Sequence, residues 1–199
     1  MIALPISILL LIILLLFIMK NKENYSNQIL NIYGQPLKVC GTASMSSGSW
    51  DSEGKCSEKG GGVHQICIKN IASSTKKFSL KTGQSNWSDQ RGKDNHCVCL
   101  GAWSLYNSDN KSVRNKKVLK CDAIPAISLS QDYVSKFSEG WNKWNGLELK
   151  DQIIHGVEAL FLNCYEPKLK KSEVLKKNYC EFAKKNKSLQ TPLYKKHCN

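Results

Sequence analysis

Two short groups of histidine and cysteine are the residues of this chain whose types and spacing could do chemistry. His64 and Cys67 enclose the first, HQIC, and the second, HCVC, contains His96, Cys97 and Cys99. Together they offer five side chains, one more than tetrahedral zinc needs from imidazole and thiolate ligands. A thiol beside an imidazole could also act as an activated nucleophile, if the ring reaches the sulfur. Zinc binding, nucleophilic catalysis and a structural role are therefore the three alternatives.

The cysteine count favours the structural role. The chain of 199 residues holds nine cysteines, a density typical of a disulfide framework or a metal site. Neither group has the Cys-x2-Cys spacing of a zinc ribbon, and neighbours on a strand, such as His96 and Cys97, face opposite ways. We expect no catalytic residue and no cofactor, with zinc on the five side chains named above as the alternative. We predict at least one disulfide among the candidates Cys40, Cys56, Cys67, Cys97 and Cys99. The pairs that could form such a disulfide include Cys40 with Cys56, and Cys67 with Cys97 or Cys99.

An apolar segment opens the chain. Residues 1–19 contain no charged side chain and one polar one, Ser7. A helix of this length rises ~28 Å, close to the ~30 Å hydrocarbon core of a bilayer. A cleaved signal peptide would have a basic start and a small-residue cleavage site, and neither is visible here. We predict a single-pass transmembrane anchor over 1–19, followed by a polar tether over 20–30.

The side of the membrane stays open. Lys20 and Lys22 follow the apolar segment, which by the positive-inside rule favours a cytoplasmic domain. The cysteines favour an oxidising compartment instead, as do Asn-x-Ser sequons at residues 24, 86, 110 and 186. A viral envelope or inner membrane would reconcile the two, since some large DNA viruses oxidise such proteins themselves. Partners in the same membrane or virion are expected in that setting.

Lysine dominates the charge of the chain. The formal net charge is +13, and the last 35 residues carry ten lysines against three glutamates. Arg91 and Arg114 are the two arginines. Because bidentate reading of bases and phosphates favours arginine, we expect no sequence-specific nucleic-acid binding. A lysine surface attracts anionic lipid only diffusely.

Pattern changes divide the remaining chain. Residues 31–137 hold short apolar runs between Gly- and Ser-rich stretches, including 63–68 and 97–103, which predicts a cysteine-rich α+β domain of short strands and loops. Residues 70–96 and 107–117 are polar and predict surface loops. A helical segment is expected over 138–187, and a frayed basic tail over 188–199.

Helical periodicity begins after residue 129. From an N-cap at Ser130, one helical face carries aromatic residues (Tyr133, Phe137, Trp141 and Trp144). A second apolar helix is predicted from Ile153 to Cys164. A third has Ser172 as its N-cap and a buried side of four residues (Val174, Leu175, Tyr179 and Phe182).

The middle of the chain resembles the bacterial family known as domain of unknown function 2237. Residues 31–40, NIYGQPLKVC, resemble its opening N-x-x-G-x-P-L-x-x-C, and 62–67, GVHQIC, its G-x-H-T-V-C segment. Residues 97–103, CVCLGAW, are similar to its W-C-L-C-A-x-R-W segment. Residues 118–120 and 128–134 match its V-V-L-E strand and closing S-L-E-D-L helix. The resemblance covers 31–137 and implies a compact domain with paired cysteines and no known reaction.

Three departures from that family limit what the resemblance implies. The proline-rich stretch before W-C-L-C is absent, and His96 stands at the family's tryptophan position. Cys121 and Asp122 stand where the family has acidic residues and histidine after V-V-L-E. The sequence as a whole predicts a membrane-anchored, non-enzymatic structural or binding protein stabilised by disulfides. The alternative is a membrane-tethered enzyme that depends on a thiol or on zinc.

Overall fold

A two-stranded antiparallel sheet lies at the centre of the domain. The computed structural model describes residues 10–15, 28–41, 49–57, 64–109, 116–130 and 152–199. Strand β1 (His64–Ile68) pairs with β2 (His96–Cys99), and an irregularity in the register falls between His64 and Ile66. Most side chains of both strands are buried, since helices cover both sides of this small sheet. Buried residues therefore follow one another along both strands instead of alternating with exposed ones.

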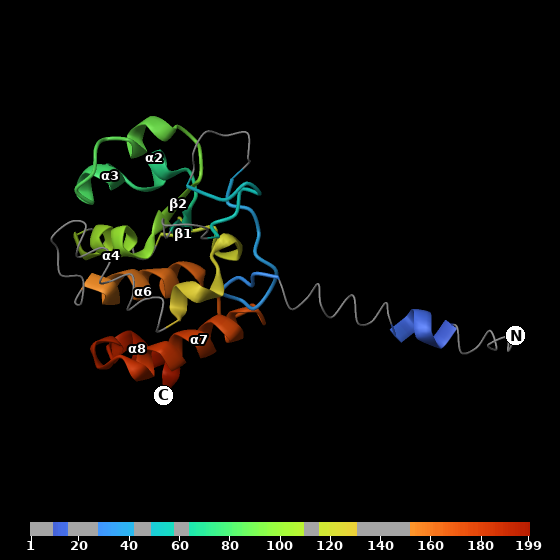
Figure 1. The fold of residues 1–199 in the computed structure, drawn as a ribbon. Helices are drawn as coiled ribbons and strands as arrows, with labels where there is room; N and C mark the ends of the chain where they lie inside the picture. Colours follow the sequence, from blue (N-terminus) through green and yellow to red (C-terminus); the bar gives the residue numbers. More distant parts are fainter. Residues whose placement is uncertain (1–9, 16–27, 42–48, 58–63, 110–115, 131–151) are drawn as a thin grey trace, which may run out of the picture.

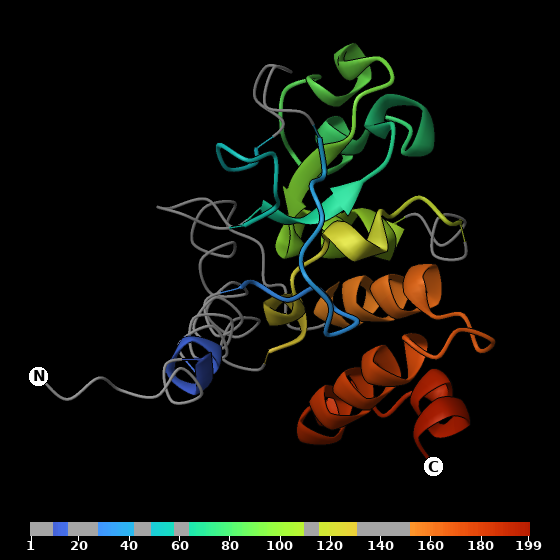
Figure 2. The same ribbon diagram turned by 90° about the vertical axis from the view of Figure 1, so that its right-hand side faces the viewer.

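Short helices make up the rest of the described chain, and they stack in layers. Helices α2 and α3 lie on one side of the sheet, α4 on the other, and α6 and then α7 and α8 follow beyond α4 (Figures 1 and 2). The α-helices are α2 (Ile71–Ser74), α3 (Phe78–Lys81), α4 (Leu100–Asp109), α6 (Gln152–Cys164), α7 (Ser172–Lys185) and α8 (Pro192–Cys198). The 3-10 helices are η1 (Ser88–Arg91), η3 (Cys121–Ala123), η4 (Ala126–Leu129) and η5 (Lys187–Leu189).

One hydrophobic core runs through these layers. Its buried side chains extend along the chain from Ile32 to Leu189, and include Trp103 of α4 and Phe161 of α6. The predicted α+β class is confirmed. The predicted boundary between residues 137 and 138 lies outside the described residues. Among the described residues, buried side chains of α6 and α7 belong to the same core as those of the cysteine-rich part.

Helices α4 and α6 cross closely because α6 presents a glycine. A Cβ atom on Gly156 would lie 2.8 Å from the Cα atom of Ser104 and still closer to its hydroxyl oxygen. The Trp103 indole N–H donates to the Gly156 carbonyl at 3.0 Å, so the buried ring has a partner for its polar atom. The crossing therefore depends on the absence of a side chain at residue 156.

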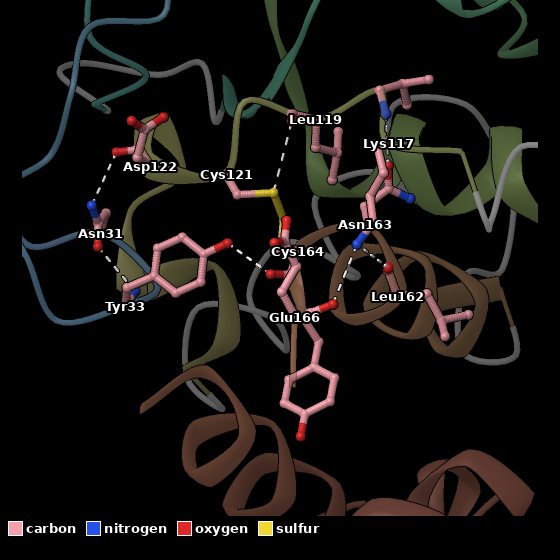
Figure 3. The surroundings of a disulfide bond; sticks show 12 residues. Asn31, Tyr33, Lys117, Leu119, Cys121, Asp122, Leu162, Asn163, Cys164 and Glu166 are labelled. Atoms are coloured by element: carbon pink, nitrogen blue, oxygen red, sulfur yellow. Dashed lines mark hydrogen bonds between the residues drawn. A yellow bond between two sulfur atoms is a disulfide. The ribbon is translucent and has the colours of Figure 1, made fainter. Parts of the chain in front are cut away.

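A disulfide joins the cysteine-rich part to the end of α6 (Figure 3). Cys121 bonds to Cys164, and the Tyr33 hydroxyl donates to the Cys164 carbonyl at 2.7 Å. The Lys117 ammonium donates to two carbonyl oxygens at the C-terminal end of α6, at 3.2 and 3.3 Å. A cation is favourable there because the last carbonyls of a helix lack backbone partners.

The helix predictions hold for α6 and α7 with two corrections. Ser172 lies inside α7, where its hydroxyl accepts from the backbone N–H of Glu166, and the N-cap is Lys171. Val174 is 39% exposed, although it was expected on the buried side. The buried side of α7 also includes Ala183.

Two predicted loop or strand regions contain helices. The run 97–103 continues as a strand only to Cys99, and α4 begins at Leu100. The polar stretch 70–96 contains α2, α3 and η1. The expected frayed tail is a helix, α8, and the Cys180–Cys198 disulfide attaches it to α7. The predicted aromatic face at 133–144 lies outside the described residues.

The N-terminal segment is described over residues 10–15. These six residues are helical, and their large apolar side chains are 43–61% exposed. Within the part of the chain that the structure describes, no helix is long and apolar enough to cross a bilayer. Most of the predicted anchor, 1–9 and 16–19, lies outside the described residues.

Candidate functional site

Disulfides use eight of the nine cysteines, all nine of which lie in the described part of the chain. Their four S–S bonds are 1.92–2.01 Å long. The pairs are Cys40–Cys67, Cys56–Cys97, Cys121–Cys164 and Cys180–Cys198, and Cys99 is free. The predicted disulfide and cysteine-rich character is confirmed.

The pairing in the middle of the chain differs from the pairs suggested by the sequence. Cys67 and Cys97 are direct partners across the two strands, yet each bonds to a cysteine from a loop. The sulfur atoms of Cys40, Cys56 and Cys67 lie within 4.8 Å of one another. Two buried disulfides are thus neighbours. This arrangement ties the segments that carry Cys40 and Cys56 to β1 and β2.

The five side chains considered for zinc do not form a ligand set. The sulfurs of Cys67 and Cys97 are consumed by disulfides, so they cannot bind metal as thiolates. His64 pairs with Cys99 in the ladder, whereas His96 pairs with Ile68. The two imidazoles therefore start from opposite ends of the sheet. These residues do not fit tetrahedral zinc in the oxidised protein.

Cys99 has a structural partner of its own. Its sulfur accepts the backbone N–H of Ala102 at 3.4 Å, in the first turn of α4. Part of the residue reaches the surface, but the thiol is enclosed, and burial raises the pKa of Cys99 to about 12. Hydrogen bonds from the backbone of α4 oppose this rise without reversing it. At neutral pH the sulfur stays a thiol, which is a poor nucleophile.

His64 from the first histidine–cysteine group and all three side chains of the second line one cavity of about 240 Å³ beside the sheet. Two larger hollows, of about 410 and 340 Å³, have neither histidine nor cysteine among their described lining residues. The 240 Å³ cavity takes its walls from both strands, η1 and α4. Its described lining residues are Ser49, His64, Phe78, Gln84, Trp87, Arg91, His96, Cys97, Val98, Cys99 and Ala102.

Trp87 forms a fixed wall of this cavity. Its indole N–H donates to the Gln84 side-chain oxygen at 3.0 Å, and Gln84 in turn donates to the Thr82 hydroxyl at 2.9 Å. The ring packs on His96 with centroids 4.4 Å apart, and on Phe78 at 6.3 Å in an edge arrangement. The orientation of the indole is therefore set before any ligand arrives.

His96 is the buried polar group of the cavity. The residue is 4% exposed, and its Nδ1 atom has no hydrogen-bond partner among the described residues. Its Nε2 atom lies 3.4 Å from the Ser49 hydroxyl. Burial lowers the pKa of His96 to about 3, and the charges of Arg91 and His64 add to the shift. The imidazole is neutral at physiological pH and cannot serve as a general base of ordinary strength.

The sequence predicted no cavity here. Four of the five side chains that it singled out, His64, His96, Cys97 and Cys99, are among the described lining residues, and Cys67 is not. Trp87 and Arg91 were assigned to a surface loop because residues 70–96 are polar. A tryptophan within such a stretch is the signal that could have indicated a buried wall.

Comparisons of the chain with protein-family models, with curated proteins and with solved structures return no match. The resemblance to domain of unknown function 2237 therefore stays a prediction.

Proposed function

We propose that this chain is a membrane-anchored, non-enzymatic binding protein whose domain is stabilised by disulfides. The observation that carries the proposal is the pairing of eight of nine cysteines in the described structure. Disulfides form and persist in oxidising environments, so the domain belongs to such an environment or to a virion.

The state of the histidine–cysteine groups supports binding over catalysis. An activated thiol needs a lowered pKa and an imidazole that accepts its proton. Burial raises the pKa of Cys99 and lowers that of His96. Both shifts are opposite to those that an activated thiol and its base need. The cavity beside them has one fixed aromatic wall and several polar groups, a lining typical of small-molecule sites.

The anchor is the second part of the proposal. Residues 1–19 are apolar, and the described part of this segment is helical with exposed side chains. Exposed leucine and isoleucine side chains on a helix are unfavourable in water and favourable in lipid. We propose that this segment holds the domain at a cellular or virion membrane, where other membrane or virion proteins are its neighbours.

Two measurements on the full chain test the proposal. After expression in cells, membranes are washed with alkaline carbonate and the protein is sequenced from its N-terminus. We expect it to stay in the pellet with its N-terminus intact. Thiols are then counted by mass spectrometry after alkylation in denaturant without reductant, and one free thiol is expected.

Two results would contradict the proposal. Release into the carbonate supernatant, or a mature N-terminus after residue 19, would remove the anchor. Five or more free thiols with stoichiometric zinc would favour the thiol- or zinc-dependent enzyme instead.

A further inference from the structure

We propose that four cysteines form a zinc site when their two disulfides are reduced, namely Cys40, Cys56, Cys67 and Cys97. The proposal goes beyond the proposed function, which concerns the oxidised domain. It is carried by the gathering of these sulfurs at one place in the core. Four thiolates are an established ligand set of structural zinc.

The sulfurs are close enough to share one ion. Those of Cys40, Cys56 and Cys67 lie within 4.8 Å of one another. The fourth sulfur is that of Cys97, the disulfide partner of Cys56. Tetrahedral zinc with Zn–S distances of about 2.3 Å holds any two of its sulfurs about 3.8 Å apart. All four residues are fully buried, as the closed coordination of a structural site requires.

Bonds other than the disulfides also hold the backbone around these cysteines. Cys67 and Cys97 are partners in the ladder of β1 and β2. The Cys40 N–H donates to the Gly54 carbonyl at 2.7 Å, and the Asn95 side-chain amide donates to the Cys40 carbonyl at 2.6 Å. Reduction removes none of these hydrogen bonds directly, because none uses a sulfur atom. They are few, so we expect the loops to loosen in the reduced, metal-free chain, and zinc to join them to the strands again.

The reaction balances with a dithiol as the reductant. Each disulfide takes two electrons and two protons from one dithiol, which leaves as its own disulfide. Zinc then binds four thiolates, and four protons are released to water. A phosphine can replace the dithiol in the laboratory, since it supplies two electrons and takes up the oxygen of water as phosphine oxide, while the two protons of that water go to the sulfurs.

The other sulfurs do not share this arrangement. Among the described residues, no second group of three or more histidine, cysteine, aspartate or glutamate side chains gathers its ligand atoms in this way. The two remaining disulfides are therefore isolated pairs, and full reduction should create one zinc site per chain. The proposed site uses no histidine, and so it differs from the set that the sequence suggested.

The site would also resolve the conflict over the side of the membrane. Lys20 and Lys22 favour a cytoplasmic domain, whereas disulfides favour an oxidising compartment or a virion. A domain that is closed by zinc in the first setting and by disulfides in the second keeps one fold in both. This step rests on the proposed anchor, but zinc binding itself does not.

The test uses the full chain in detergent. Its thiols are counted as isolated, and the chain is then reduced with a phosphine in denaturant and returned to detergent buffer under argon, with or without zinc. Bound zinc is measured by elemental analysis after gel filtration, and folding by near-UV circular dichroism. We expect one zinc per chain in the reduced protein and none in the oxidised one. Cobalt in place of zinc should give the visible absorption of a tetrahedral thiolate site.

Two double variants assign the zinc to these cysteines. Cys40→Ser with Cys67→Ser removes one disulfide and two ligands, and should weaken zinc binding at least about a hundredfold, since even residues behind the ligands are worth about 10–100-fold. Cys180→Ser with Cys198→Ser also removes one disulfide and should leave affinity within about twofold. If the first variant fails to fold, the stoichiometry and the cobalt spectrum of the unaltered chain decide the question.

Three results would overturn the proposal. The reduced chain could fold without binding zinc, or fail to fold in its presence. It could bind two zinc ions, which would show that the four sulfurs do not share one. Both double variants could weaken binding equally. Zinc and five or more free thiols in the protein as isolated would instead contradict the proposed function and leave this site standing, so the two fail separately.

Discussion

The burial of His96 predicts that acid destabilises this protein well above the pH at which its carboxylates protonate. In the folded chain the pKa of His96 is about 3, against the usual 6.5, because burial disfavours the imidazolium and Arg91 and His64 repel it. Between pH 6.5 and 3 the unfolded chain therefore binds more protons than the folded one. The free energy of unfolding then falls as the pH falls through that window, and the stability is fully present above it.

The size of the effect follows from these two values. At pH 4.5 the unfolded imidazole is almost fully protonated and the folded one almost fully neutral. The difference between pH 7 and pH 4.5 then amounts to about 2–3 kcal/mol from His96 alone. This is a large part of the stability of an ordinary domain, which is about 5–15 kcal/mol.

Substitution separates His96 from other groups that titrate with the same sign. The pKa of His197 is lowered by partial burial and by Lys196 and Lys176, and hydrogen bonds from Ser57 and neighbouring N–H groups lower that of Asp51 against the effect of burial. His96→Phe keeps a ring against Trp87 and removes the proton. His197→Phe is the matched control on a more exposed ring.

The assay is urea unfolding of the full chain in detergent, without reductant, at pH 7 and pH 4.5. The pH difference in the free energy of unfolding should shrink by about 2–3 kcal/mol in His96→Phe. It should change much less in His197→Phe. Equal pH dependence in the unaltered chain and in His96→Phe would refute the reasoning, and so would an NMR titration that gives His96 a pKa near 6.5.

Three further predictions concern packing and sulfur chemistry. Gly156→Ala should lower the free energy of unfolding by about 1–3 kcal/mol despite the better helix propensity of alanine, because the new Cβ meets the Ser104 backbone, and an unchanged melting temperature would contradict the close crossing. Replacing Cys180 and Cys198 together by Ser should cost about 3 kcal/mol, from an 18-residue separation, and free α8 for tryptic cleavage; equal cleavage rates would count against it. Cys99 should resist iodoacetamide in the native protein and react on unfolding, and rapid native labelling would show that its thiol is accessible.

The helices that the sequence predicted are those with a clear periodicity. In α6 and α7 apolar residues recur every three or four positions, and this spacing fixes which face is buried. Val174 is the exception. It borders the buried stripe of α7, and spacing alone cannot decide how wide that stripe is.

The end of β2 could not be predicted from periodicity. A buried strand and a buried helix both read as a continuous apolar run, and residues 97–103 contain one of each. Helices usually begin with Ser, Thr, Asp or Asn as the N-cap. Here the Cys99 sulfur accepts the N–H of Ala102 in that position, so the ordinary signal for the start of α4 is missing.

The cysteine pairing could not be predicted from the sequence, for a different reason. Several connectivities are possible among the five cysteines of the middle region, and spacing does not rank them. The structure bonds each strand cysteine to a loop cysteine, although the two strand cysteines are neighbours in the ladder. The choice depends on where the loops lie, which is a property of the whole fold.

This pairing explains how so small a sheet can form one wall of the cavity. A two-stranded sheet is marginal by itself, and each strand here gains a covalent neighbour through Cys67 or Cys97. Ser49 lies between Cys40 and Cys56 in the chain, so both flanks of its segment are fixed to the sheet. Its hydroxyl lies 3.4 Å from Nε2 of His96, so this segment is held against β2. The two neighbouring disulfides thereby fix one wall of the cavity, because reduction would release Ser49 together with the loops.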